Sequence, residues 1–187
     1  KVGSDDLTNL PFIEFVARKG RPVIMSTGMA DLAEVAEAVE TFLATENKDL
    51  ILLHCLSNYP IHDLSLMNLR AIQTLAAAFH LPVGLSDHSG TIFAGLAAAT
   101  IGIDLLEVHV TMSRAMFGPD VPASVTLDEL RQLIEGVRFI ERPFCEVLGL
   151  PFSHDLGAGI LSAQAIADPP SFDRLRAVAV HEGVVRD

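Results

Sequence analysis

Short apolar runs recur along this chain at a spacing that restricts the folds it can adopt. Strand-like runs cover residues 22–25, 49–55, 82–85 and 104–110, and a segment with helical hydrophobic periodicity follows each of them. A strand followed by a helix, repeated roughly every thirty residues, is the pattern of a parallel sheet. The runs are apolar without alternation, which is typical of strands buried on both faces. The sequence therefore predicts an α/β fold.

Polar residues gather at the C-terminal ends of these runs. Ser26 follows the first run, Ser86 and His88 end the third, and His109 lies near the end of the fourth. Parallel strands bring their carboxyl ends to one rim, which is where the active site lies in a (β/α)8 TIM barrel. No Gly-x-Gly-x-x-Gly motif follows any run, which disfavours a dinucleotide-binding fold. Residues 1–4 read as the tail of a further strand, so we expect the C-terminal part of a TIM barrel, about strands 4 to 8.

Composition and charge limit the classes of partner. The chain has 187 residues, of which 50% are hydrophobic, enough for one domain with a real core. Its formal net charge of −11 argues against nucleic acid or an anionic membrane as a partner. No apolar run is long enough to span a membrane. Two cysteines form no disulfide framework and no signal peptide is recognisable, which favours a reducing cytoplasm.

The chain divides into two parts at the level of sequence. Residues 1–142 carry the strand–helix pattern, and Thr126 with Glu129 fits a capping box at the start of a helix over 127–142. Residues 143–187 lack the pattern and are predicted to be a linker or extension, with a short helix around 172–180. The chain begins with Lys1 rather than methionine, so we expect a fragment that lacks upstream barrel strands.

The two histidines at the predicted rim suit metal chemistry. Neutral imidazoles of His88 and His109 can hold a divalent ion and leave positions open for water and a substrate oxygen. Glu107 alternates with His109 along the same run, so its carboxylate is expected on the same side, as a partner of a site residue or as a member of a buried ion pair. Two histidines that only hydrogen-bond within the core remain the alternative.

A series of short motifs carries a resemblance to a known family. They are Lys-Val-Gly-Ser from residue 1, Met-Ser-Thr-Gly-Met from residue 25, Leu-Leu-His-Cys from residue 52, Asn-Leu-Arg-Ala-Ile from residue 68, Gly-Leu-Ser-Asp-His from residue 84, Glu-Val-His-Val-Thr from residue 107 and Phe-Gly-Pro-Asp from residue 117. Their order and spacing resemble those of the sialic acid synthase family, which comprises N-acetylneuraminate synthase and its legionaminate and pseudaminate relatives. The resemblance covers residues 1 to about 142.

The resemblance implies a fold, a reaction and partners. It implies a TIM barrel that condenses phosphoenolpyruvate with an N-acetylated hexosamine such as N-acetylmannosamine. The products would be a nine-carbon 2-keto sugar acid and phosphate. It also implies a divalent metal, Mn²⁺ or Mg²⁺, and a homodimer of the full-length protein. Which amino sugar is used stays open, because the named relatives share these motifs.

The resemblance also implies roles for individual residues. His88 and His109 match the metal-binding histidines, and Asp6 stands where the family usually has a glutamate that handles a proton during attack. The residues that match substrate-binding positions are Lys1 and Ser4 for phosphoenolpyruvate, Ser26 and Ser86 for its phosphate or carboxylate, Asp120 for the sugar hydroxyls, and Ser57 and Tyr59 in a loop at the sugar pocket. Many members have asparagine at the position of Ser57.

Two other functions fit part of the sequence. The chain could be a non-catalytic half-barrel remnant that binds a metal or a partner chain. An aldolase-type barrel with a Schiff-base lysine is disfavoured, because the lysines are Lys1, Lys19 and Lys48 and none lies within a predicted strand.

Overall fold

The computed structural model describes residues 1–148 and 177–182. The helices in this part are α1 (Leu10–Ala17), α2 (Leu32–Leu43), α3 (Arg70–Phe79), α4 (Phe93–Thr100) and α5 (Leu127–Leu148). The strands are β1 (Val23–Ser26), β2 (Leu50–Cys55), β3 (Val83–Asp87), β4 (Leu105–Thr111), β5 (Ser124–Thr126) and β6 (Ala177–Glu182). Short 3-10 turns cover η1 (Ser4–Asp6), η2 (Leu64–Met67) and η3 (Val121–Ala123). No helix in the described ranges has the length and apolarity needed to cross a membrane.

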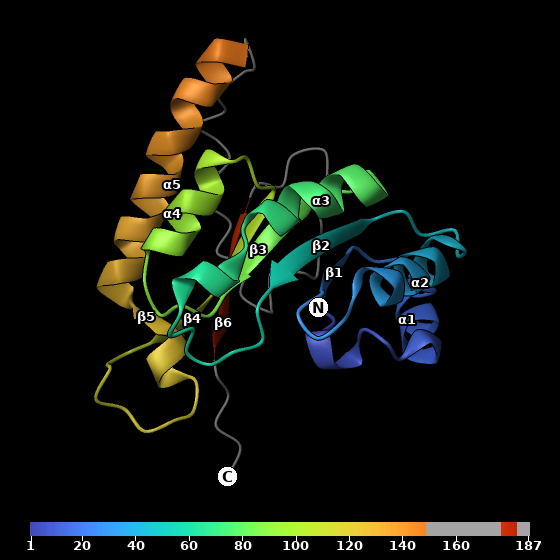
Figure 1. Ribbon diagram of the computed structural model, residues 1–187, viewed down its shortest axis with the longest axis horizontal. Helices are drawn as coiled ribbons and strands as arrows, with labels where there is room; N and C mark the ends of the chain where they lie inside the picture. Colours follow the sequence, from blue (N-terminus) through green and yellow to red (C-terminus); the bar gives the residue numbers. More distant parts are fainter. Residues whose placement is uncertain (149–176, 183–187) are drawn as a thin grey trace.

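The strands form one parallel sheet in chain order, β1-β2-β3-β4-β5 (Figure 1). Beyond β1, Val2 forms a parallel bridge with Met25. There the Val2 N–H donates to the Ile24 carbonyl at 2.8 Å, and the Ser26 N–H donates to the Val2 carbonyl at 3.1 Å. The first residues therefore continue the sheet by one more parallel pairing, as expected for a strand tail. The predicted α/β class is confirmed.

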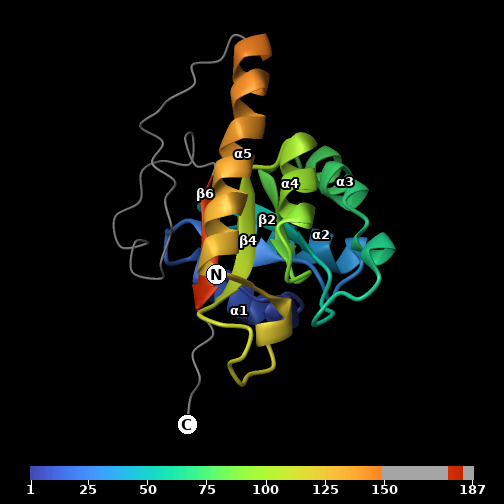
Figure 2. The same cartoon turned by 90° about the vertical axis from the view of Figure 1, so that its left-hand side faces the viewer.

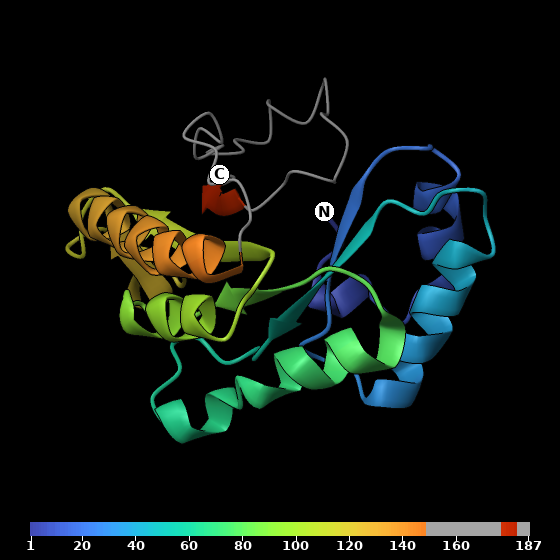
Figure 3. The ribbon, with the colours of Figure 1, turned by 90° about the horizontal axis from the view of Figure 1, so that it is seen from above.

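The strands are buried on both faces, as their unbroken apolar runs predict. In β2, Leu50 and Leu52 pack into the large core cluster that the helices share. The alternate residues Ile51 and Leu53 pack with Leu105 of β4 on the opposite face. This alternation is the two-residue period of a strand. Figure 3 shows the helices following one another along one side of the sheet.

Two helices begin with reciprocal caps that fix where they leave the sheet. At α2, Asp31 Oδ1 accepts from the Glu34 N–H at 2.9 Å, and Glu34 Oε2 accepts from the Asp31 N–H at 2.9 Å. At α5, Glu129 Oε2 accepts from the Thr126 N–H at 2.7 Å, which confirms the predicted capping box. Because α5 follows β5 directly, this cap lies at the same end of the sheet as the predicted rim.

The structure differs from the sequence prediction in three places. The predicted loop after β4 ends in the short strand β5, which pairs with the end of β4. Helix α5 continues to Leu148, beyond the predicted end at residue 142. The helix predicted over 172–180 is wrong for its described part, because β6 begins at Ala177 and pairs in parallel with β4 (Figure 2). The alternation of alanine with β-branched valine from Ala177 to Val180 favours a strand over a helix. Residues 172–176 lie outside the described residues.

Candidate active site

The two predicted metal-binding histidines lie side by side at the C-terminal ends of neighbouring strands. His88 follows β3 directly and His109 lies within β4. Their ring centroids are 5.0 Å apart. Tyr59, from the loop after β2, packs over both rings, with its centroid 4.1 Å from that of His88 and 5.7 Å from that of His109. Three consecutive strand ends therefore contribute one aromatic ring each to the same place.

The surroundings of His88 hold its ring in a form that suits a metal ligand. Its Nδ1 lies 3.1 Å from the Leu56 carbonyl oxygen, which can only accept a hydrogen bond. Nδ1 therefore carries the proton in the neutral ring, and Nε2 keeps its lone pair. Burial, with the nearby charge of His109, lowers the pKa of His88 to about 4. The imidazole is neutral at physiological pH, as metal binding requires.

A charged network lies on the strands beside the histidines. The Lys1 ammonium donates to both carboxylate oxygens of Glu107 at 2.8 Å. The Ser86 hydroxyl donates to Glu107 Oε1 at 2.7 Å. Glu107 is buried and belongs to the same strand as His109. Glu107 is thus a member of an ion pair, as expected, but the pair is only partly buried, because the Lys1 side chain is 25% exposed.

Two further serines line this end of the sheet. Ser26, at the end of β1, is buried, and its Oγ has no hydrogen-bond partner among the described residues. Ser4 Oγ accepts a hydrogen bond from the Gly28 N–H at 3.0 Å, and this bond does not use the hydroxyl proton of Ser4. A buried hydroxyl without a partner is unfavourable, so the described part of the chain leaves one polar atom unsatisfied at this rim.

The pKa of Tyr59 reflects its burial and the charged groups around it. Burial raises its pKa to about 12, and the negative charges of Cys55, Asp120, Glu107 and Asp5 add to the effect. The phenol is therefore neutral and able to donate a hydrogen bond. Asp120, on the loop after β4, thus lies close enough to the site for its charge to be felt.

The remaining predicted residues are less closely joined to this site. Ser57 lies on the same loop as Tyr59, and its Oγ is 3.9 Å from the sulfur of Cys55. Asp6 is exposed on the turn η1, and no hydrogen bond in the described residues links its carboxylate to either histidine. Its neighbour Asp5 is the one whose charge reaches Tyr59. The role of Asp6 stays a prediction.

Sequence reasoning missed some contacts of the site. The Leu56 carbonyl, which selects the tautomer of His88, is a backbone atom and leaves no signal in the sequence. The sulfur of the buried Cys55 lies 3.8 Å from His88 Nδ1, a contact that the sequence does not indicate. His54 does have a structural role, because its Nε2 lies 2.7 Å from the Met67 carbonyl oxygen and donates to it.

The residues present fit a divalent ion held by two histidines. No group of three or more His, Cys, Asp or Glu residues within the described ranges could hold a metal by itself. A metal–imidazole bond is about 2.0–2.1 Å long, so one ion can reach two rings whose centroids are 5.0 Å apart. Two protein ligands would leave the other positions to water and substrate, which is the arrangement of a catalytic rather than a structural site.

Comparisons with known proteins point to one family. The model of the NeuB family matches residues 1–147. The N,N'-diacetyllegionaminic acid synthase of Legionella pneumophila is 41% identical over 145 residues, covering 75% of this chain and 40% of the relative. The crystal structure of the spore coat polysaccharide biosynthesis protein SpsE of Bacillus subtilis has a TM-score of 0.75 at 35% identity, covering 83% of this chain and 44% of that one.

A second solved structure agrees. It is the N-acetylneuraminic acid synthetase of Leptospira borgpetersenii in complex with citrate, with a TM-score of 0.73 at 34% identity, covering 87% of this chain and 52% of that chain. The present chain thus spans about two fifths to one half of the length of the relatives it matches. The matched segment contains β1 to β5 and every residue of the site described above. The chain belongs to the NeuB family, the family of the sialic acid synthases.

Proposed function

We propose that this chain carries the C-terminal strands of a TIM-barrel synthase that condenses phosphoenolpyruvate with an N-acetylated hexosamine. The observation that carries the proposal is the pair of adjacent imidazoles of His88 and His109 beside the Lys1–Glu107–Ser86 network. The two histidines suit a divalent metal and form the metal half of the site. The Lys1–Glu107–Ser86 network suits an anion and forms the anion half. The in-order parallel sheet and its polar C-terminal rim support a barrel.

The anion half of the site would bind phosphoenolpyruvate. Lys1 provides a full positive charge and three donors, which suit phosphate or carboxylate oxygens. In the structure its charge is balanced by Glu107, so a phosphate would compete with that carboxylate for the ammonium. The unpartnered hydroxyl of Ser26 and the unused hydroxyl proton of Ser4 supply further donors.

The metal half of the site would bind the open-chain sugar. When bound, a divalent ion such as Mn²⁺ or Mg²⁺ polarises the aldehyde oxygen and stabilises the negative charge that develops there. His88 and His109 hold the ion, and Tyr59 covers both rings from the loop after β2. Asp120 would orient the sugar by binding the sugar's hydroxyls. Ser57, on the same loop as Tyr59, would line the same pocket.

The reaction needs little covalent participation by the protein. C3 of phosphoenolpyruvate attacks the aldehyde carbon, water adds at C2, and phosphate leaves as its bond to C2 breaks. Phosphoenolpyruvate is already an enol ester, so positioning and charge stabilisation supply most of the acceleration. Asp6 would exchange the proton of the attacking water if the turn η1 brings it to the substrate. We also propose a cytoplasmic location and a homodimer for the whole protein.

The test measures phosphate release from phosphoenolpyruvate in the presence of Mn²⁺ and N-acetylmannosamine, with a 2,4-diacetamido hexose in parallel. It uses the chain alone and the chain joined to the N-terminal half of the Legionella relative, because the chain spans 40% of that protein. We expect release by at least the joined protein, and its loss in His88→Ala and His109→Ala. The control is His62→Ala, since His62 is exposed on the loop after β2.

Two results would oppose the proposal. If both histidine variants still release phosphate, His88 and His109 take no part in the reaction. A joined protein that folds and binds Mn²⁺, yet releases no phosphate with either sugar, would favour the non-catalytic remnant.

A further inference from the structure

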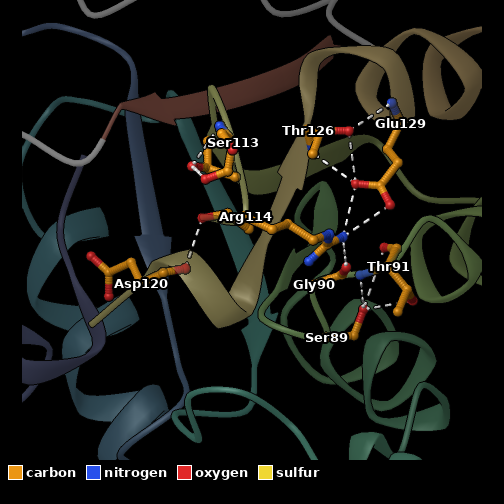
Figure 4. A network of polar contacts seen from close by, with 10 residues as sticks. Ser89, Gly90, Thr91, Ser113, Arg114, Asp120, Thr126 and Glu129 are labelled. Carbon is orange, nitrogen blue, oxygen red and sulfur yellow. Dashed lines mark hydrogen bonds and ion pairs between the residues drawn. The ribbon is translucent and has the colours of Figure 1, made fainter. Parts of the chain in front are cut away.

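Arg114 joins the loops that follow β3 and β4. Its Nη2 donates to the Gly90 carbonyl at 2.8 Å and to both carboxylate oxygens of Glu129 at 2.9 and 2.8 Å (Figure 4). The same carboxylate accepts from the Thr126 N–H and hydroxyl at the start of α5. One guanidinium therefore connects both loops to the N-terminal cap of a helix.

The two loops also meet at a second point. Gly90 has a φ of +66°, and a Cβ added there would lie 2.3 Å from the Pro122 carbonyl oxygen. A side chain at this position would force the loops apart, so the backbones touch because residue 90 is glycine. The Arg114 contact and the Gly90 contact together hold the loop after β4 against the loop after β3.

Each of these loops begins at or shortly after one of the paired histidines: His88 is the first residue after β3, and the loop after β4 starts at Met112, beyond His109. Gly90 is two residues after His88, and Arg114 is five residues after His109 on the loop that also carries Asp120. The Ser124 hydroxyl donates to the Asp120 carbonyl at 2.7 Å, which fixes the far end of that loop. A shift of either loop would therefore move one imidazole relative to the other and would move Asp120.

The Arg114–Glu129 ion pair stabilises the protein too little for the fold to depend on it. The side chains of Arg114 and Glu129 are 44% and 34% exposed, and ion pairs in contact with water contribute little to stability. Removing Arg114 should therefore leave the fold intact. A metal site is more demanding, because small errors in ligand placement weaken binding strongly.

We propose that Arg114, paired with Glu129, is a positioning residue that clamps the two rim loops and so sets the spacing of His88 and His109 for one divalent ion. The role rests on the proposed function, because it presupposes that the histidines bind a metal. It goes beyond that function in assigning a task to two residues that contact neither the metal nor the substrate. The anion half of the site lies outside the two loops, at the start of the chain and within the strands, so the clamp should not affect it.

The test is calorimetric titration of the whole chain with Mn²⁺ and, separately, with phosphoenolpyruvate in the absence of metal. The variants are Arg114→Ala, Arg114→Lys and Glu129→Gln. The glutamine oxygen can still accept from the Thr126 N–H, so this variant breaks the ion pair and keeps the helix cap. The matched control is Arg131→Ala, which removes an exposed ion pair with Asp128 on the same helix and, within the described residues, no hydrogen bond to either loop.

We expect Arg114→Ala and Glu129→Gln to weaken Mn²⁺ binding about tenfold, as loss of supporting contacts does at other metal sites. Arg114→Lys should recover part of the affinity, and Arg131→Ala should stay within twofold of the unmodified chain. Phosphoenolpyruvate binding should stay within twofold in every variant. A variant that loses affinity for Mn²⁺ but keeps its affinity for phosphoenolpyruvate has misplaced metal ligands, whereas a general loss of structure would weaken both.

The proposal is overturned if Arg114→Ala binds Mn²⁺ within twofold of the unmodified chain, or if Arg131→Ala weakens binding as much. Either result leaves the proposed function standing, because the unmodified chain still binds the ion. If the unmodified chain binds no Mn²⁺, both proposals are wrong.

Discussion

Ser26 is the residue whose burial and hydrogen bonding conflict most clearly with a purely structural role. Its hydroxyl is buried at the end of β1 without a partner in the described part of the chain. Ser86, by contrast, is equally buried and donates to Glu107. The two serines occupy corresponding ends of different strands, so they form a matched pair for separating function from stability.

Replacing Ser26 by alanine should stabilise the free protein by roughly 1 kcal/mol, because an unsatisfied buried hydroxyl is removed. The same change should weaken phosphoenolpyruvate binding about tenfold, because a donor to the anion is lost. Ser86→Ala should destabilise the protein by roughly 1 kcal/mol, since it leaves a buried carboxylate oxygen with one donor fewer. Urea unfolding and calorimetric titration measure both effects. A destabilised Ser26→Ala would show that its hydroxyl has an internal partner.

Asp87 and His88 are neighbours whose pKa values move in opposite directions. Burial raises the pKa of Asp87 from 3.8 to about 6, although the Ser89 N–H and hydroxyl partly offset this. Between those values the folded chain holds more protons at Asp87 than the unfolded chain, so this group raises stability as the pH falls. His88 titrates at 6.5 when unfolded and at about 4 when folded, so it lowers stability as the pH falls through that range.

These two effects nearly cancel in the metal-free protein between about pH 6 and pH 4. Asp87→Asn should therefore lose stability on acidification relative to the unmodified chain, by about 1 kcal/mol per pH unit. His88→Asn should gain by a similar amount over the same range. The measurement is the free energy of unfolding in urea at several pH values with a chelator present. Curves that run parallel to that of the unmodified chain would contradict these pKa assignments.

At the scale of elements, the close approach of β3 and β4 depends on Gly84. A Cβ at this position would lie 2.0 Å from the Leu105 carbonyl oxygen, a backbone atom of β4 that cannot move away cheaply. Since β3 and β4 carry the two histidines, this contact also sets how close the imidazoles lie.

Gly84→Ala should destabilise the protein by roughly 3 kcal/mol or more, because the strands must separate. The matched control is Gly20→Ala, where φ is +62° but nothing lies within 4 Å of an added Cβ. That change should destabilise by only about 1 kcal/mol through backbone strain. Chemical unfolding followed by circular dichroism compares the two variants. Equal destabilisation would show that steric contact with β4 is not the determining factor.

Elements with a strong hydrophobic pattern could be predicted from the sequence, and pairings between distant segments could not. The runs that became β1 to β4 are rich in large apolar residues that the core buries, so their hydrophobic pattern and their burial agree. The three-residue β5 is too short to show a period, and it exists because Ser124 and its neighbours pair with the end of β4. Strand β6 likewise depends on pairing with β4, which periodicity within residues 177–182 does not encode.

On the scale of the whole molecule, the site is assembled from side chains far apart in sequence. Lys1 and Glu107 form an ion pair because parallel pairing brings the start of the chain and β4 to one rim. Because parallel strands bring their carboxyl ends to one rim, the sequence predicted this rim and the two histidines on it. It did not predict that Arg114 would join two loops, because long side chains on loops follow no such rule.

The measurement that tests the account most directly is pulsed electron paramagnetic resonance of Mn²⁺ bound to the chain, which counts coordinated imidazole nitrogens. We predict one tightly bound ion with two imidazole nitrogens. His88→Ala and His109→Ala should each leave at most one nitrogen and much weaker binding, whereas His62→Ala should keep both nitrogens. Bound Mn²⁺ without imidazole coupling, or a signal unchanged by loss of either histidine, would contradict the assignment of this rim as a synthase metal site.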